Sequence, residues 1–351
     1  MRRLLLIKIT VLLSGILFFS SVSNKAQSLE ETLNNLSNTF GAAYVEPIVS
    51  AFGSNLNSGW VSGVPSASLV GFTLRLKAVG IGSFFSDENK RFNTSGNFHF
   101  TQSQANFILQ QNGLSSGPTY DALMTQLLRS QGWTVKMSGP TIVGSEDENV
   151  ILTFPDASLN GIAETNLNLE EVTGFLDELP ALPSAAIQLT VGTVAGTHVS
   201  LRWFPDIEIQ DLGKFSFFGI GFLHNPGVWL NNPLPIDLAI GFFTQTMKVG
   251  DIFESSATQY GLWASKTFGM GISITPYAGL TMETSKTTVS YDYTYDTPAS
   301  SVTSNLNLDL EGNNDFGLTV GANLKLAVLN LFVDYKMAKT STVSGGLWFG
   351  F

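Results

Sequence analysis

His198 and Ser200, in the run His198-Val199-Ser200, are the side chains whose types and spacing come nearest to nucleophilic catalysis. A serine nucleophile needs a base within hydrogen-bonding reach and a third group that orients this base. Residues two apart in a strand point to the same face, so a strand here would place imidazole and hydroxyl side by side. The pair supplies two of the three groups that acyl transfer requires.

Metal and thiol chemistry have fewer candidates. The chain has 3 His and no Cys, which excludes thiolate ligands, thiol catalysis and disulfides. His224-Asn225-Pro226 is typical of a turn, and Glu146-Asp147-Glu148 of a solvated loop. Because a metal site needs several convergent ligands, we expect no metal and no cofactor.

The segments that must carry such groups have a period of two. Within Asp315–Phe351, three segments alternate apolar residues with polar residues or glycine: 316–326, 329–337 and 343–351. Successive side chains of a strand point to opposite faces, so this period predicts strands with one apolar face. The other face carries whole charges and must therefore face water.

An apolar outer face and a charged inner face are typical of an outer-membrane β-barrel, whose wall meets lipid and whose lumen takes polar residues. A soluble sandwich would instead bury the apolar face against a second sheet. The chain is 44% hydrophobic and only 13% charged, yet no apolar run after residue 23 is long enough for a membrane helix. The formal charge of −10 argues against nucleic acid as a partner.

Residues 1–26 are typical of a signal peptide, because Arg2, Arg3 and Lys8 accompany an apolar run. A transmembrane anchor is the alternative, although the run is short for one. Cleavage between Ala26 and Gln27 would release the mature chain into the periplasm.

Residues 27–63 are expected to form a helical segment, and residues 64–351 the barrel. Ser28 and Glu31 match a capping box. Apolar residues then recur at helical spacing, namely Leu29, Leu33, Leu36, Phe40 and Tyr44. Such a segment would either plug the lumen or lie against the periplasmic rim, and the sequence leaves both open.

Parity along the strands places one set of charged and polar side chains in the lumen. The set is Arg75, Lys77, His198, Arg202, Asp237, Lys325, Asp334 and Lys336. We expect these residues to pair across the lumen and fill it. The alternative is that they bind the head group of an amphipathic ligand.

Strands counted backwards from Phe351 predict the topology. If the last strand runs toward the periplasm, the short links fall on that side and the long connection 284–302 lies outside, as in known barrels. The turn 224–234 is an exception, long yet periplasmic. Nine strands follow Ala186, and a periplasmic N-terminus requires an even total. Residues 69–154 would then supply three or five strands, giving 14 strands or alternatively 12.

The last strand, with Leu347, Phe349 and Phe351 on one face, resembles the C-terminal sorting signal of Gram-negative outer-membrane barrels. The helical segment, the strand number and the many Phe and Gly residues resemble the long-chain fatty-acid transporter superfamily. A closer resemblance is to an uncharacterised Gram-negative barrel family, a domain of unknown function placed near those transporters. Its pattern here is Leu182-Pro183, Gln188, Gly196-Thr197, Arg202-Trp203-Phe204-Pro205, Gly219-Ile220-Gly221 and His224-Asn225. These resemblances imply a barrel that the assembly machinery inserts among outer-membrane lipids.

The arrangement of His198 and Ser200 resembles that in outer-membrane phospholipases, which use a His and a Ser two residues apart on one strand, with an Asn as the third group. Here both side chains point into the lumen, and the following strand, roughly 213–223, has no Asn. We therefore expect no enzyme, and a lipid-active barrel enzyme is the last alternative.

Two other functions stay open. The first is porin-like passive uptake of a small hydrophobic or amphipathic ligand through a monomeric, plugged barrel. The second is a structural or partner barrel in secretion or envelope assembly, which would act through the hairpin carrying Tyr291, Tyr293 and Tyr295.

Overall fold

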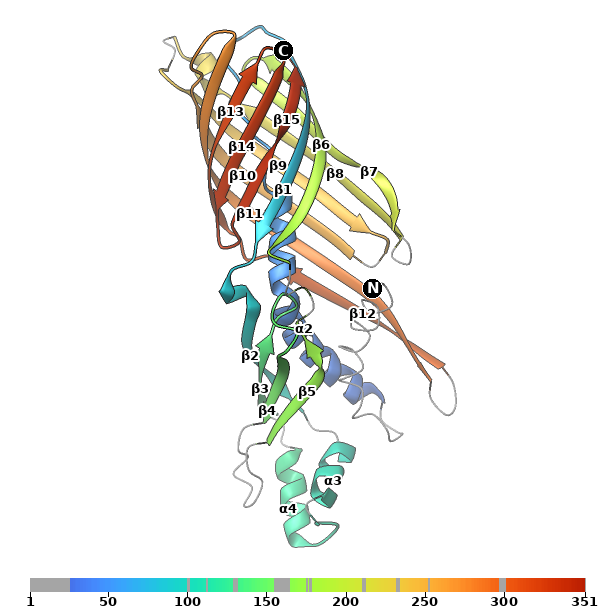
Figure 1. Ribbon diagram of the computed structural model, residues 1–351. Coiled ribbons are helices and arrows are strands. Elements are labelled where there is room, and N and C mark those ends of the chain that lie inside the picture. The colour runs from blue at the N-terminus through green and yellow to red at the C-terminus, as the bar shows by residue number, and fades with distance from the viewer. Residues whose placement is uncertain are drawn as a thin grey trace. The chain divides into compact units, whose positions relative to one another are not determined.

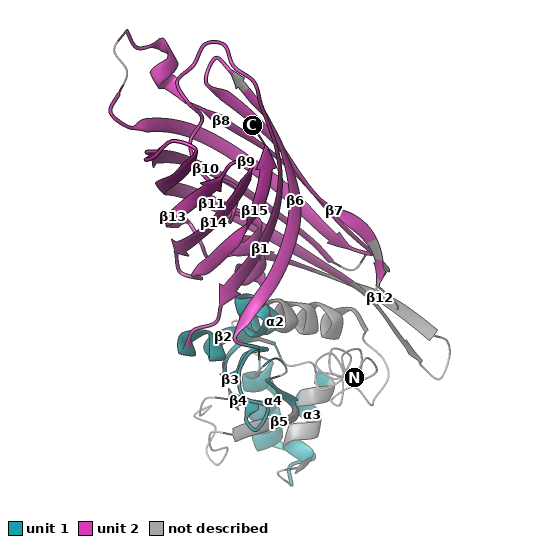
Figure 2. Ribbon diagram, turned by 45° about the horizontal axis from the view of Figure 1, so that its top comes forward, with its two compact units in different colours: residues 1–47, 87–179 teal, residues 48–86, 180–351 magenta. Residues whose placement is uncertain are grey.

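The computed structural model describes most of the chain and divides it into two compact units. The described residues are 26–99, 102–111, 113–128, 132–154, 165–174, 176, 179–209, 213–231, 234–251, 253–296 and 301–350. Unit 1 comprises residues 1–47 and 87–179, and unit 2 comprises residues 48–86 and 180–351 (Figure 2). No helix among the described residues is both long and apolar enough to span a membrane.

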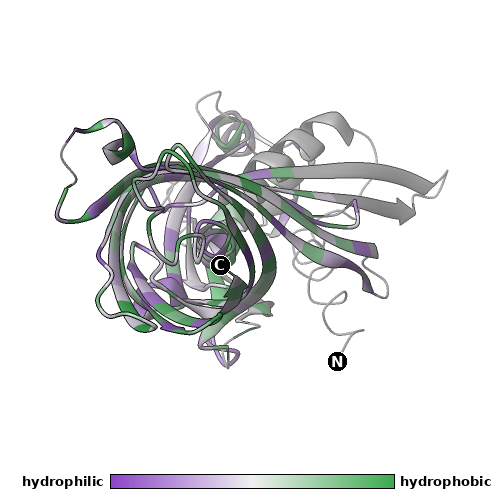
Figure 3. Ribbon diagram, turned by 90° about the horizontal axis from the view of Figure 1, so that it is seen from above, coloured by the Kyte–Doolittle hydropathy of each residue, from purple (hydrophilic) through white to green (hydrophobic). Residues whose placement is uncertain are grey.

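Unit 2 is an antiparallel sheet that closes on itself. Ten strands form the barrel, because β10 pairs with β11 at the closure. They are β1 (Thr73–Phe84), β6 (Ala181–Val194), β7 (Thr197–Ile209), β8 (Gly213–His224), β9 (Asp237–Val249), β10 (Phe253–Ser265), β11 (Ile272–Asp296), β13 (Phe316–Leu326), β14 (Leu329–Met337) and β15 (Thr342–Gly350). Figure 1 shows the strands side by side, and Figure 3 shows them from above as a ring.

The eleventh strand of this sheet extends one wall. β12 (Ser301–Glu311) pairs with the far half of β11, from Lys286 to Asp296. The near half of β11, from Ile272 to Met282, pairs with β13 and completes the barrel. The predicted hairpin beyond the barrel is therefore present. The side chains of Tyr291, Tyr293 and Tyr295 lie outside the described residues.

The expected alternation holds along the barrel strands. Large apolar side chains are exposed on the outer face, including Leu76 at 49%, Phe222 at 45% and Leu262 at 60%. Their neighbours in sequence point inward, as Lys77, Leu223 and Trp263 do, and all three are buried. Leu347 and Phe349 of the expected sorting signal are exposed on the outer face of β15, and Phe351 lies outside the described residues.

The predicted strand number of 14 or 12 is wrong, because the barrel has ten. Nine barrel strands follow residue 180, as the sequence indicates, but residues 69–154 supply only β1. The strands β2, β3 and β4 of that region, given below with their bounds, belong to a separate sheet in unit 1. Alternation reports one buried face, and a sheet packed on a helix has one just as a barrel wall does. The even total is confirmed.

Unit 1 is built on a four-stranded sheet in the order β2-β3-β4-β5. The strands are β2 (Arg91–Phe98), β3 (Trp133–Pro140), β4 (Asn149–Phe154) and β5 (Thr165–Thr173), with the short η2 (Asp87–Lys90) before them. Phe40 and Tyr44 of helix α2 (Ala26–Leu56) pack with Val135, Met137 and Val150 of the sheet. A second cluster joins α3 (Gln102–Gln111) and α4 (Pro118–Leu127) to Trp133.

Helix α2 passes from one unit to the other. It continues through Pro47. Proline inside a helix removes one backbone hydrogen bond, and the boundary between the units falls here. Ala26 and Gln27 begin the helix, and residues 1–25 of the expected signal peptide lie outside the described residues.

Candidate functional site in the barrel lumen

Residues 48–65, the lumen segment, run through the barrel from one end to the other. The C-terminal end of the barrel is the end where β15 finishes and β1 begins, since Arg75 pairs with Gly350. At the far end, Ser83 pairs with Thr342 and Phe84 with Ala181. The far end is also where the chain leaves unit 2 at residues 86 and 180.

At the far end the lumen segment is helical and close to the wall. Ser50 Oγ accepts a hydrogen bond from the Asn313 backbone at 3.1 Å. The Ser54 hydroxyl lies 2.7 Å from that of Thr342. Gly53 allows this approach, because a Cβ there would overlap the Ser285 side chain. The chain before Ile48 therefore leaves the barrel at the far end.

Lumen-facing cations contact the carbonyl groups at and just beyond the C-terminus of α2. The Lys77 ammonium donates to the carbonyls of Gly59 and Trp60, both at 2.8 Å. The Arg202 guanidinium donates to the Ser58 carbonyl at 2.9 Å. These carbonyls follow Leu56, the last residue of α2, and have no regular secondary structure to pair them, so the buried cations supply the hydrogen-bond donors that they need.

Two neutral side chains and one lysine that is ion-paired also donate to backbone carbonyls of the lumen segment. Gln188 donates to the Trp60 carbonyl at 3.1 Å, and Gln245 donates to that of Leu56. Lys336 donates to the Ser54 carbonyl at 3.2 Å and forms a buried ion pair with Glu283 at 2.8 Å. The backbone of the lumen segment is thus bound from several sides of the barrel.

Beyond Leu56 the lumen segment is no longer helical and continues toward the C-terminal end through a turn and bends. Trp60 packs with Phe243 and Trp263, and the Arg202 guanidinium lies over the Trp60 ring at 3.9 Å. Further along, the Ser265 hydroxyl accepts from the Val64 backbone at 3.1 Å, and Asn225 donates to the Pro65 carbonyl at 2.7 Å. The short η3 (Pro226–Trp229) follows Asn225 at this end. The sequence leaves two placements open for the N-terminal segment, in the lumen or against the periplasmic rim, and residues 48–65 lie in the lumen.

The predicted lumen residues fall into three groups. Lys77, Arg202 and Lys336 bind the lumen segment, rather than pairing only with acids across the lumen. Arg75, His198 and Asp334 also face the lumen, and Asp334 accepts from the Tyr277 hydroxyl at 2.8 Å. Asp237 is half-buried next to Asn225, and Lys325 is exposed near the C-terminal end.

Gln188, Gln245 and Glu283 belong to the same network but are absent from the predicted set. All three have inward parity, which is the signal that could have found them. They were missed because inward uncharged residues are common in barrels, and only the lumen segment makes these particular ones important.

His198 and Ser200 both lie inside the barrel, with exposed fractions of 3% and 6%. The Ser200 hydroxyl lies 2.7 Å from that of Thr190 and accepts from Gln188 at 3.4 Å. The Ser200 hydroxyl is therefore part of the polar lining next to the lumen segment. Within the described ranges, no three His, Asp or Glu side chains converge as metal ligands would.

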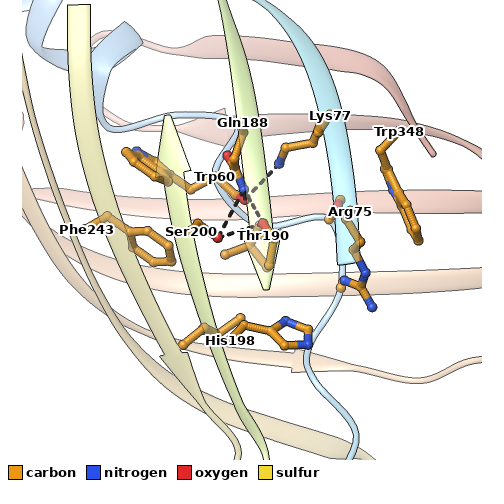
Figure 4. A pocket seen from close by; sticks show the side chains of 13 residues that line it. Trp60, Arg75, Lys77, Gln188, Thr190, His198, Ser200, Phe243 and Trp348 are labelled. Atoms are coloured by element: carbon orange, nitrogen blue, oxygen red, sulfur yellow. Dashed lines mark hydrogen bonds between the residues drawn. The ribbon is translucent and has the colours of Figure 1, made fainter. Parts of the chain in front are cut away.

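A small cavity remains between the lumen segment and the wall, with a volume of about 30 Å³. Figure 4 shows Arg75 between His198 and Trp348 at this cavity, with Thr190 and Ser200 beside it. A cavity of this size has room for about one or two water molecules.

Several solved barrel structures are similar to the chain in outline. The β domain of the Bordetella autotransporter BrkA shares 8% identity over 80% of this chain and 100% of that one, with a TM-score of 0.30. The transport unit of AIDA-I from Escherichia coli shares 7% over 88% and 97%, with a TM-score of 0.27. A loop-deletion mutant of OmpT from Vibrio cholerae shares 8% over 80% and 98%, with a TM-score of 0.23. Such low scores establish neither fold nor function for this chain.

The sequence matches no curated protein. The predicted resemblance to fatty-acid transporters has no support from the comparisons and stays a prediction. The predicted membership of an uncharacterised family is confirmed, because the model of a family of unknown function, DUF6588, matches residues 1–351. The chain belongs to the DUF6588 family.

Proposed function

We propose that this chain is a Gram-negative outer-membrane β-barrel that serves as a closed anchor, presenting unit 1 and the β11–β12 hairpin for a structural or partner role in the envelope. The observation that carries the proposal is the lumen segment, whose carbonyls are bound by Lys77, Arg202 and Lys336 inside the barrel. A lumen occupied along its length by the chain itself favours an anchor over an open pore.

The exposed outer face supports the membrane location. Leu76, Ile220, Phe222 and Leu262 are exposed there by more than a third, while charged residues such as Lys77 and Lys336 are buried inside. Soluble monomers rarely expose large contiguous apolar patches. A barrel wall in contact with outer-membrane lipid has this pattern, and its insertion would depend on the barrel assembly machinery.

Loop lengths support an orientation. The links 195–196 and 327–328 lie at the C-terminal end, whereas the 87–179 insertion and the β11–β12 hairpin leave from the far end. Outer-membrane barrels have short periplasmic turns and long outer loops, so the far end faces outward. The link 225–236 remains the long exception. In this orientation the chain before Ile48 also emerges on the outer side, contrary to the periplasmic placement predicted for residues 27–63.

Passive uptake of small hydrophobic or amphipathic compounds is less well supported. Pockets for such compounds measure roughly 300 Å³ or more, about ten times the cavity beside Arg75. Uptake would require the lumen segment to leave the barrel. Likewise no lipid-active site is supported, because His198 and Ser200 face the lumen and not the lipid side.

Epitope accessibility on intact cells tests the anchor and its orientation. One variant carries an epitope in the exposed 113–117 link of unit 1, and a matched variant carries it at the exposed Ala327-Val328 turn. We expect antibody to bind the first on intact cells and the second only after the outer membrane is permeabilised. The reverse result, or recovery of the protein outside the outer-membrane fraction, would contradict the proposal.

A further inference from the structure

We propose that Arg75 and the cavity beside it bind a carboxylate group that enters from the C-terminal end of the barrel. Arg75 projects from β1 into the lumen, and its pairing with Gly350 places it close to that end. The inference goes beyond the anchor role, and binding itself does not depend on which side of the membrane this end faces.

Arg75 differs from its cationic neighbours because its charge is unmatched. Its Nε is buried without a hydrogen-bond partner. Within the part of the chain that the structure describes, its guanidinium forms no hydrogen bond or ion pair, and its one specific contact is with the Trp348 ring at 4.7 Å. A guanidinium carries five N–H donors, so several remain available for a ligand.

The neighbouring cations lack this capacity. Lys77 and Arg202 donate to carbonyls of the lumen segment, and Lys336 is paired with Glu283. Among the residues that the structure describes, Asp334 is the remaining buried carboxylate nearby, and it accepts a hydrogen bond from Tyr277. Within the described residues, the three cations Arg75, Lys77 and Arg202 thus share one carboxylate that is in no ion pair, and a bound anion would reduce this excess of positive charge.

The cavity defines the size and chemistry of the anion. Arg75, His198, Thr190 and Ser200 provide polar atoms around about 30 Å³, and Trp348 provides an apolar wall. The planar guanidinium fork matches the two oxygens of a carboxylate in a bidentate pair. The cavity has room for the carboxylate group alone, which it fits better than a bulkier, tetrahedral phosphate, so an attached short alkyl chain would extend out of the cavity toward the C-terminal end of the barrel.

Saturation-transfer NMR with butyrate tests the site on the full chain in detergent micelles, with butyramide as the neutral probe of similar shape. We expect saturable butyrate binding and none for butyramide. Arg75→Gln should weaken butyrate binding about tenfold or more, because a charged hydrogen-bonded pair is lost. Arg75→Lys, which keeps the charge but loses the fork, should fall between the two. Lys248→Gln removes an exposed cation at the far end of the barrel and is the control, which should leave binding unchanged.

Each variant is checked for folding by testing whether its barrel, without heating, resists unfolding in detergent. If Arg75→Gln does not fold, the comparison of Arg75→Lys with Lys248→Gln decides. The inference is overturned if the wild-type chain shows no saturable butyrate binding, if butyramide binds equally, or if folded Arg75 variants bind as the wild type does. A crystal structure with Arg75 paired to a carboxylate of the chain itself would also overturn it.

Discussion

At the scale of single residues, the buried cations of the lumen are the best test of how the plug is held. Lys77 is 3% exposed and donates to two carbonyls of the lumen segment. Lys77→Met keeps much of the side-chain volume but leaves both carbonyls without this donor. We expect a loss of about 2 kcal/mol in unfolding free energy, the usual cost of unpaired buried polar groups. Denaturant unfolding in micelles, followed by tryptophan fluorescence, measures it.

Lys325→Met is the matched control, because Lys325 lies on an inward position but is exposed. Its effect should stay within about 0.5 kcal/mol, as for most surface substitutions. Equal effects of the two substitutions would show that the contacts of Lys77 with Gly59 and Trp60 contribute nothing to stability.

Tyr44 of unit 1 gives a pH-dependent prediction. Burial raises the pKa of the Tyr44 phenol from 10.0 to about 12, and its hydroxyl donates to the Thr173 carbonyl at 2.8 Å. A raised pKa means that the folded state holds the proton more tightly than the unfolded state. The resulting stability is fully present below pH 10.0 and is lost as the pH rises through about 12.

Phenolate absorbance of the wild type minus that of Tyr44→Phe isolates this titration. We expect the difference to rise near pH 12 while unit 1 stays folded. A difference that rises at the ordinary tyrosine value would mean that the Tyr44 hydroxyl is in contact with water.

At the scale of elements, the helical part of the lumen segment can be locked to β15. Ser54 and Thr342 have hydroxyls 2.7 Å apart, which is close enough for a disulfide after small adjustments. Because the chain has no Cys, Ser54→Cys/Thr342→Cys introduces one defined pair. We expect the disulfide to form on oxidation and to leave assembly and cell-surface presentation unchanged.

The same lock separates the anchor from a transporter. If uptake requires the plug to leave, oxidation should abolish compound uptake and reduction should restore it, and such a result would favour the transport hypothesis. The single variants Ser54→Cys and Thr342→Cys control for loss of the hydroxyls. Failure of the disulfide to form in folded protein would mean that α2 does not approach β15 here.

The strands and helices also show which parts of the fold the sequence predicts. Alternation identified the barrel strands from Ala186 onward and the inward parity of Lys77 and Arg202, because lipid outside and a polar lumen inside impose a strict period. Alternation could not separate β2 to β4 from barrel strands, since a sheet of unit 1 also has one buried face. The sequence could not show on which side of the barrel the N-terminal segment begins. A helix before β1 can reach the C-terminal end either from outside the barrel at that end or by passing through the lumen, and its local sequence would be the same in both cases.

At the scale of the whole molecule, the two units have different physical requirements. Unit 2 places apolar side chains on its outside, whereas the sheet of unit 1 packs Val135, Met137 and Val150 with α2. The chain between them crosses at residues 47, 86 and 179, and β1 and β6 are already paired at Phe84 and Ala181. The barrel wall is therefore continuous without the insertion.

This continuity predicts that the insertion is dispensable for barrel formation. In a variant with residues 87–179 replaced by a short Gly-Ser turn, Phe84 and Ala181 remain directly paired, and a tight turn suffices for antiparallel neighbours. We expect the variant to reach the outer membrane and to resist unfolding in detergent as the wild type does, while any partner held by unit 1 is lost. A matched variant that removes residues 327–328 instead should fail to assemble, because this link joins β13 to β14 directly. If the deletion of 87–179 also abolishes assembly, unit 1 is required for the barrel itself, and the division between anchor and presented unit is wrong.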